Sequence, residues 1–125
     1  MKGRGLAIIA ATYCLLAVML AAFGAHLLQG ADDSTQKLWA TAQQIHLFHA
    51  AALLALAALA GVRNSVFIDI SGLVISLGVL LFSGSLYLRS AGFDFLWGPL
   101  TPAGGLIIML GWAALILTLI RKNEF

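Results

Sequence analysis

Four long apolar segments constrain what this chain can fold into. Residues 6–28, 39–62, 66–88 and 103–120 carry at most one charged side chain each, and an α-helix needs about 20 apolar residues to cross the hydrocarbon core of a membrane. Of the 125 residues, 62% are hydrophobic and 10% are charged, compared with about 45–50% and about 25% in soluble domains. The sequence therefore predicts an all-α membrane protein with one domain, built as an antiparallel bundle of four transmembrane helices.

The basic residues predict how these helices are oriented. Most of them lie at the end of the spans that carries both chain termini: Lys2, Arg4, Arg63, Arg121 and Lys122. Two lie at the opposite end: Lys37 and Arg89. Because cytoplasmic loops are enriched in Lys and Arg, both termini are predicted to be cytoplasmic. The first segment follows a basic stretch, as in a signal peptide, but it exceeds the usual apolar region of about 7–15 residues and is expected to be retained.

Two polar stretches indicate where helices begin. Asp33, with Gln36 three residues later, matches a capping box. This cap would let the second helix begin outside the membrane, with Trp39 at the interface. Before the fourth segment, Thr101 is a candidate N-cap and Pro102 would take the first helical position, where proline is favoured.

Small and polar residues share one face of the third segment. Within an arc of about 60° of a helical projection lie Asp69, Gly72, Ser76, Ser83 and Tyr87. Small and hydroxyl-bearing residues let membrane helices approach closely and hydrogen-bond to one another. The face is therefore predicted to be a packing seam, and an ion path is the alternative.

Asp69 differs from the rest of this face because a buried carboxylate is costly inside a membrane. It is expected near the cytoplasmic end of the segment, where Arg63 or Arg121 can pair with it. A carboxylate that is buried without such a partner would instead indicate function.

Close helix contacts are predicted on the other segments as well. On the first, the small residues of one face are Ala10, Cys14, Ala17, Ala21 and Ala25. On the fourth, Gly104 and Gly111 lie two turns apart on one face. The residues predicted to pack helices together are Gly72, Ser76, Ser83, Gly84, Gly104 and Gly111.

Three histidines are candidate functional residues. His26 lies near the end of the first segment, and His46 and His49 lie near the start of the second, so all three are expected in the same half of the membrane. Histidine can bind transition metals, hold haem or shuttle protons, and His26 could meet His49 across the first two helices. Structural hydrogen bonding is the favoured interpretation, because no carboxylate lies beside His46 or His49 to orient a ligating imidazole.

Other kinds of site find no support in the sequence. The serines lack a nearby base, and neither a phosphate-binding glycine loop nor a pair of carboxylates is present. The basic residues are scattered at the ends of apolar segments, so nucleic-acid binding is not predicted. Cys14 is the only cysteine, which excludes an intrachain disulfide. No catalytic residue, metal or cofactor is predicted.

A family resemblance rests on four motifs: AAFGAH (21–26), WATAQQIHLFHA (39–50), LFSGSLY (81–87) and GPLTPAGG (98–105). Their order resembles the domain of unknown function 423 family, also called uncharacterised protein family 0382, across essentially the whole chain. The resemblance implies a short multi-pass protein of the bacterial cytoplasmic (inner) membrane and supplies no reaction. The matching residues are Gly24, His26, Trp39, Ala42, His49, Gly84, Tyr87, Pro102, Gly104 and Gly105. The chain departs from the family at His46, where a polar amide is expected, so His46 is predicted to be a bystander and His26 with His49 the candidate pair.

These observations predict a non-enzymatic protein of the lipid bilayer that acts through helix contacts. It would be a homo-oligomer or an accessory subunit of a larger membrane complex, because helix surfaces are its only sizeable interaction area. The alternative is the handling of a proton, a metal or a quinone-like small molecule by His26, His49 and the face from Asp69 to Tyr87. A weaker alternative is a haem-carrying membrane protein.

Overall fold

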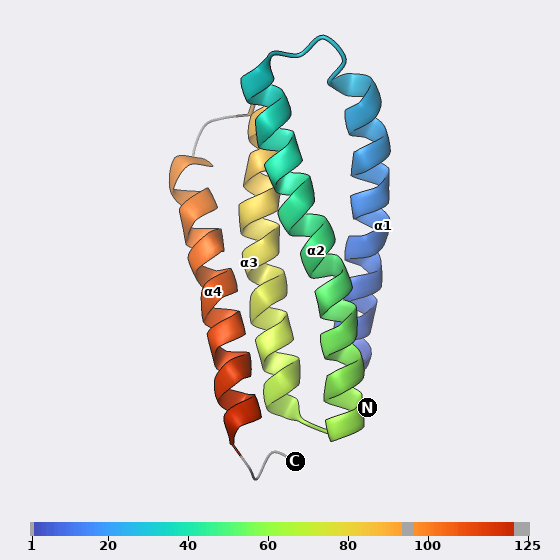
Figure 1. Cartoon of the computed structure of the whole chain (residues 1–125), viewed down its shortest axis with the longest axis vertical. Coiled ribbons are helices and arrows are strands. Elements are labelled where there is room, and N and C mark those ends of the chain that lie inside the picture. Colours follow the sequence, from blue (N-terminus) through green and yellow to red (C-terminus); the bar gives the residue numbers. More distant parts are fainter. Residues whose placement is uncertain (1, 94–96, 122–125) are drawn as a thin grey trace.

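Four helices make up most of the chain in a computed structural model, which describes residues 2–93 and 97–121. They are α1 (Arg4–Leu27), α2 (Asp33–Arg63), α3 (Val66–Ser90) and α4 (Trp97–Ile120) (Figure 1). No strand occurs in the two described ranges. All four are long and apolar enough to cross a membrane, with mean hydropathies of 2.0 to 2.5 in their most apolar windows. The four predicted membrane helices are therefore confirmed.

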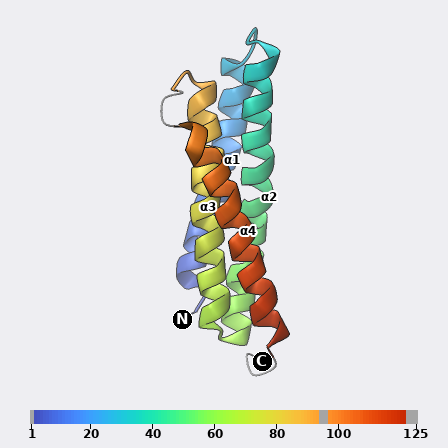
Figure 2. The same ribbon diagram turned by 90° about the vertical axis from the view of Figure 1, so that its left-hand side faces the viewer.

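The helices form an open row rather than a closed ring. α1 packs on α2, α2 on α3 and α3 on α4, while α1 and α3 touch only slightly. Among the described residues, α1 and α4 share no packing interface, so they form the two ends of the row (Figures 1 and 2). Successive helices run in opposite directions, as predicted, and both termini lie at the same end of the molecule (Figure 1).

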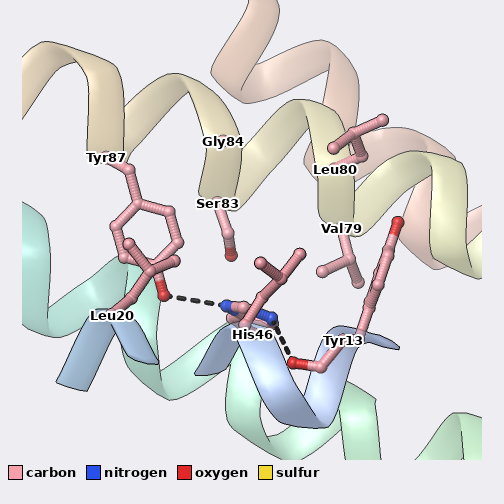
Figure 3. Close-up of a pocket in the computed structure, with 9 residues that line it drawn as sticks. Tyr13, Leu20, His46, Val79, Leu80, Ser83, Gly84 and Tyr87 are labelled. Carbon is pink, nitrogen blue, oxygen red and sulfur yellow. Dashed lines mark hydrogen bonds between the residues drawn. The ribbon is translucent and has the colours of Figure 1, made fainter. Parts of the chain in front are cut away.

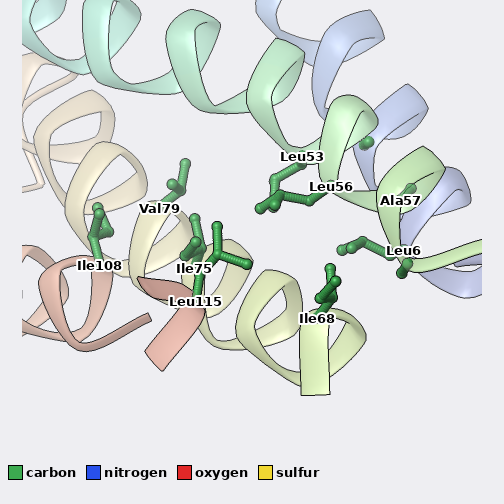
Figure 4. Close-up of a cluster of buried hydrophobic side chains, with 11 residues drawn as sticks. Leu6, Leu53, Leu56, Ala57, Ile68, Ile75, Val79, Ile108 and Leu115 are labelled. Carbon is green, nitrogen blue, oxygen red and sulfur yellow. The ribbon is translucent and has the colours of Figure 1, made fainter. Parts of the chain in front are cut away.

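α3 lies at the centre of the packing. In its most apolar window 44% of the residues are buried, compared with 17% in α1. The buried apolar side chains around it come from all four helices (Figure 4) and include Leu6, Leu53, Leu56, Ile68, Ile75, Val79, Ile108 and Leu115. This core fixes how α1, α2 and α4 are rotated about their axes, and so decides which polar side chains face α3.

α2 begins one residue earlier than the predicted cap implies. Asp32 is the N-cap, and its carboxylate accepts a hydrogen bond from the backbone N–H of Thr35 at 3.0 Å. Hydrogen bonds from the hydroxyl and then the amide of Thr35 hold the pKa of the Asp32 carboxyl below its ordinary value. The predicted capping box of Asp33 and Gln36 is wrong, because the Gln36 side chain donates instead to the backbone oxygens of Ala31 and Leu28.

The length of α2 places part of it outside the membrane. It has 31 residues, which at about 1.5 Å per residue span about 46 Å, and the hydrocarbon core is only about 30 Å thick. The connection to α3 is very short: Asn64 takes a left-handed conformation with φ 51°, as is common after a helix end. Ser65 then caps α3 by accepting from the N–H of Ile68 at 3.3 Å.

α4 begins at Trp97, so the predicted start at Thr101 and Pro102 is wrong. Pro99 lies in the first turn, where a proline is tolerated because the first N–H groups of a helix have no partner within it. Pro102 lies inside the helix and removes one helical hydrogen bond. Thr101 is not a cap, and its hydroxyl is hydrogen-bonded to Ser85 on α3.

Candidate functional site

His46 is buried on α2 and bonds to both neighbouring helices. Its Nε2 atom is 2.9 Å from the backbone oxygen of Tyr13 on α1, and its Nδ1 atom is 2.9 Å from the hydroxyl oxygen of Tyr87 on α3 (Figure 3). A carbonyl oxygen can only accept, so Nε2 carries a proton. In the neutral imidazole, Nδ1 then accepts from the Tyr87 hydroxyl, and the arrangement corresponds to the Nε2–H tautomer.

Gln43 extends these contacts into a polar chain, by which we mean Gln43, Tyr87, His46 and the backbone oxygen of Tyr13. The Gln43 amide donates to the Tyr87 hydroxyl at 2.8 Å and to the backbone oxygen of Ala17 at 3.3 Å. With His46 neutral, every proton in the chain has an acceptor: Gln43 donates to Tyr87, Tyr87 to His46, and His46 to Tyr13. An unpaired polar group costs several kcal/mol in hydrocarbon. Separating α1, α2 and α3 would leave groups of the polar chain unpaired, so these hydrogen bonds hold the three helices together.

His49, one turn further along α2, takes the opposite tautomer. Its Nδ1 atom is 2.8 Å from the backbone oxygen of Ile45, and its Nε2 atom is 3.0 Å from the indole nitrogen of Trp112 on α4. An indole N–H only donates, so Nδ1 carries the proton and Nε2 accepts. Both ring nitrogens are therefore used, and His49 joins α2 to α4.

His26 takes no part in this arrangement. It is exposed near the end of α1, whereas His49 bonds to Trp112 on α4. The predicted contact between His26 and His49 is therefore wrong, and His46, predicted to be a bystander, is a central member of the polar chain. The physical reason is the rotation of α2: two residues three apart differ by about 60° around a helix, which turns His46 toward α1 and α3 and His49 toward α4.

Asp69 lies in the first turn of α3 and anchors the start of α1. Its Oδ2 atom accepts from the backbone N–H of Gly3 at 3.1 Å, and its Oδ1 atom is buried with no hydrogen-bond partner in the described part of the chain. Within residues 2–93 and 97–121, the hydrogen-bond donor found for Asp69 is thus the backbone of Gly3 and not the guanidinium of the expected Arg63 or Arg121. Gly3 lies so close to α2 that a Cβ there would overlap the backbone oxygen of Ala57.

Glycines bring α3 and α4 into close contact. A Cβ on Gly104 would meet backbone atoms of Phe82 and would lie 2.9 Å from the oxygen of Gly78. A Cβ on Gly111 would lie 3.1 Å from the backbone nitrogen of Ile75. Such short separations are open only to glycine, which lets membrane helices pack backbone to backbone. Gly104 and Gly111 were predicted as packing residues; Gly78 was not singled out from the sequence.

The predicted packing residues of α3 face α1 and α2. A Cβ on Gly72 would overlap the side chain of Leu6 on α1. The hydroxyl of Ser83 donates to the backbone oxygen of Ala42 on α2 at 2.9 Å. Ser76 is buried, but its hydroxyl donates to the backbone of its own helix. All three residues therefore contact a neighbouring helix, although Ser76 does so through its backbone oxygen, which accepts from the Tyr13 hydroxyl on α1.

Other predicted packing positions are not packed. A Cβ on Gly84 would meet nothing within 4 Å, so its predicted role in helix packing is wrong. Ala21 and Ala25 on α1 are exposed and Cys14 is half-buried. The buried residues of this helix are instead Leu6, Ala10, Ala17 and Gly24. The predicted face is therefore only partly correct: Ala10 and Ala17 are buried, but the helix continues this buried face through Leu6 and Gly24 rather than through Ala21 and Ala25.

The buried polar groups hold helices together and leave few reactive atoms free. The four ring nitrogens of His46 and His49 are engaged, and the Tyr13 hydroxyl donates to the backbone oxygen of Ser76 at 2.6 Å. In residues 2–93 and 97–121, no three His, Cys, Asp or Glu side chains are grouped so as to hold a metal ion.

Tyr13, Gln43 and Trp112 were missed as site residues. Each is a hydrogen-bonding side chain within an apolar segment. A polar group inside a membrane needs a partner, so a search for every such side chain in the four segments would have found all three.

Comparison with known proteins shows the family of this chain. A family model described as "Protein of unknown function (DUF423)" matches residues 20–105. The UPF0382 membrane protein YwdK of Bacillus subtilis is 35% identical over 116 residues, which is 91% of this chain and 94% of YwdK. The UPF0382 inner membrane protein YgdD of Escherichia coli K12 is 36% identical over 125 residues, which is 99% of this chain and 95% of YgdD.

This chain belongs to the DUF423 (UPF0382) family. The resemblance found in the sequence is confirmed, and the protein is a multi-pass protein of the bacterial inner membrane. No solved structure matches it. The family is one of unknown function, so membership brings no reaction with it.

Three motifs that carried the resemblance to the DUF423 family meet beside the polar chain. Gly24, from AAFGAH, lacks the Cβ that would overlap the indole of Trp39, from WATAQQIHLFHA. Trp39 packs edge-on against Tyr87, from LFSGSLY, with ring centroids 4.8 Å apart. The fourth motif, GPLTPAGG, contributes Thr101, which bonds to Ser85 of LFSGSLY. These motif residues are therefore helix-contact residues brought together from distant segments.

Proposed function

We propose that this protein is not an enzyme and acts through contacts of its helix surfaces, as a homo-oligomer or as an accessory subunit of a larger membrane complex. The observation that supports this most is the state of the two buried histidines. A catalytic base needs a nitrogen that can face a substrate. The nitrogens of His46 and His49 are instead shared with α1, α3, α4 and the backbone of α2.

The two ends of the helix row supply the surface for such contacts. In the most apolar windows of α1 and α4, only 17% and 28% of the residues are buried. Association of membrane helices depends on close packing rather than on the hydrophobic effect. An end helix without a second neighbour is therefore the natural place for a partner helix to pack.

The charge distribution supports cytoplasmic termini as part of this proposal. Both termini and the connection between α2 and α3 lie at one end of the molecule (Figure 1). The described basic residues of these segments are Lys2, Arg4, Arg63 and Arg121. By the positive-inside rule this end faces the cytoplasm. A green fluorescent protein fused to the C-terminus is expected to fluoresce, and an active alkaline phosphatase fusion at that site would refute this orientation.

Handling of a proton or a metal by His26 and His49 has less support. His26 is exposed on α1, and His49 has both ring nitrogens occupied. An absorption spectrum and a metal analysis of the purified protein distinguish the two proposals. A Soret band or stoichiometric metal would favour the alternative.

The proposed function is tested by purifying the full chain from its native membrane in a mild detergent. Light scattering coupled to chromatography gives the mass of the protein, and mass spectrometry of proteins that purify with it identifies a partner. We expect either a multimer of this chain or a stoichiometric second membrane protein. A monomer that carries no other protein, in several mild detergents and in nanodiscs, would refute the proposal.

A further inference from the structure

A small cavity lies between α1 and α3, above the polar chain (Figure 3). Its volume is about 120 Å³. Its floor is His46, and its walls include Leu16, Leu20, Val79, Leu80 and Gly84. α1 meets α3 nearer its start, where Leu6 lies against Gly72 and Tyr13 bonds to Ser76, and the cavity is a cleft between the two helices beyond these contacts.

The cleft opens toward lipid. Leu16 and Leu80 at its rim are 41% and 58% exposed. Leu16 lies near the middle of α1, and Gly84 lies six residues before the end of α3 at Ser90, about 9 Å from that end at about 1.5 Å per residue. The cleft therefore lies at the depth of the hydrocarbon core and not of the lipid headgroups.

The lining of the cleft is apolar in effect although tyrosine and histidine contribute to it. No polar atom of the lining residues is exposed to the cavity, because the polar groups of His46, Tyr87 and Tyr13 are turned into hydrogen bonds between helices. An apolar cavity of about 150 Å³ stays dry and binds small apolar groups such as benzene. A cleft of this size and lining therefore fits a short stretch of hydrocarbon chain.

Gly84 makes room for this cleft. Unlike Gly104 and Gly111 on α4, it has nothing within 4 Å of the position that a Cβ would take. Helix packing therefore does not require a glycine at this position. Because Gly84 has no side chain, the side of the cleft that α3 forms is open toward the lipid. We propose that one acyl chain of a bilayer phospholipid occupies the cleft, inserted between α1 and α3 against Gly84 and over His46.

Native mass spectrometry of the full chain tests this proposal. The protein is reconstituted in liposomes of palmitoyl-oleoyl phosphatidylethanolamine and phosphatidylglycerol and released into a mild detergent. The wild type is expected to retain a phospholipid, and Gly84→Leu, which fills the cleft from α3, is expected to lose it. Gly5→Leu is the matched control, because Gly5 is also a helical glycine with nothing within 4 Å but lies at the start of α1 and does not line the cleft. This variant is expected to retain the lipid.

Three results would overturn the proposal. Gly84→Leu could retain as much phospholipid as Gly5→Leu, the wild type could retain none, or the retained mass could be that of a free fatty acid or an isoprenoid. Circular dichroism and unfolding of both variants show whether each has folded.

A second measurement uses the unaltered protein and so does not depend on the folding of a variant. A phosphatidylcholine with a diazirine in the middle of its sn-2 chain is added to the same liposomes and activated by light. Labelling is expected to be enriched at Leu16, Leu20 and Gly84 over Met109 and Leu110, which are exposed near the middle of α4. Equal labelling of the two sets would overturn the proposal.

Discussion

Alanine at Gly104 is predicted to destabilise the protein relative to alanine at Gly84. The two changes are chemically identical and both lie inside apolar helices. A Cβ at Gly104 would lie 2.9 Å from the oxygen of Gly78 and 2.9 Å from the Cα of Phe82, whereas a Cβ at Gly84 would meet nothing within 4 Å. Because the atoms that face Gly104 belong to the backbone of α3, α4 must move away to admit a methyl group.

The expected difference follows from two contributions. Both variants gain the higher helix propensity of alanine, about 0.8–1.0 kcal/mol, and this gain cancels when they are compared with each other. Only Gly104→Ala is overpacked, which typically costs about 1–3 kcal/mol. The free energy of unfolding of Gly104→Ala should therefore be about 1–3 kcal/mol below that of Gly84→Ala, a large part of a total that is typically about 5–15 kcal/mol.

Equilibrium unfolding in mixed micelles of a mild detergent and sodium dodecyl sulfate, followed by far-ultraviolet circular dichroism, measures this difference. Gly84→Ala should be as stable as the wild type or slightly more stable. Equal stability of the two variants would show that α3 and α4 are not in backbone contact at Gly104, and a less stable Gly84→Ala would show that the cleft is not open.

Three further predictions concern hydrogen bonds. Trp112→Phe leaves a buried nitrogen of His49 without its donor and should lower the free energy of unfolding by about 1–3 kcal/mol. In the double variant with His49→Phe, the free energy of unfolding should fall by less than the sum of the two single decreases. Strict additivity in the same unfolding assay would contradict the bond. Tyr87→Phe removes both a donor and an acceptor from the polar chain and should cost about 1–3 kcal/mol, which no change in unfolding would refute. Hydrogen bonds from Thr35 lower the pKa of the Asp32 carboxyl. This carboxylate should therefore stabilise the start of α2 at any pH above its unfolded pKa of about 3.9 and lose the effect as the pH falls through the lower folded pKa. Nuclear magnetic resonance of the carboxyl carbon measures this titration, and a pKa of about 3.9 or above would contradict the cap.

The helices could be predicted from the sequence because a membrane requires about 20 apolar residues per span, and this requirement is visible in the composition alone. The residues at which the helices begin were harder to predict from the sequence. Asp32 and Asp33 are equally suitable caps in the sequence, and only the backbone conformation shows that Asp32 reaches the N–H of Thr35. Likewise, Pro99 and Pro102 both suit a helix start, and it is the earlier one that lies in the first turn of α4, which begins at Trp97.

The contacts within the site could not be predicted because they depend on how each helix is rotated. α2 packs against α1 and α3 and also reaches α4, so its apolar sequence has no single buried face that would orient His46 and His49. Glycine poses a similar problem. Gly84 and Gly104 are alike in the sequence, and only the distance to the neighbouring backbone shows that one packs helices and the other borders an open cleft.

The order of the helices in space, α1, α2, α3 and α4, is also their order in the chain. Each helix therefore finds its main partner in the segment that was synthesised just before it, and the loops that must close are short. Because chains fold from the N-terminus during synthesis, α1 and α2 can pair before α3 leaves the ribosome, and α4 can join a completed α3 without parting any earlier contact. The two buried histidines of α2 have to wait for later helices: His46 has no donor for Nδ1 until Tyr87 arrives on α3, and His49 has none for Nε2 until Trp112 arrives on α4. The insertion of α3 thus completes the hydrogen bonds of His46, and the packing of α4 then supplies the last one that the early hairpin lacks, from Trp112 to His49.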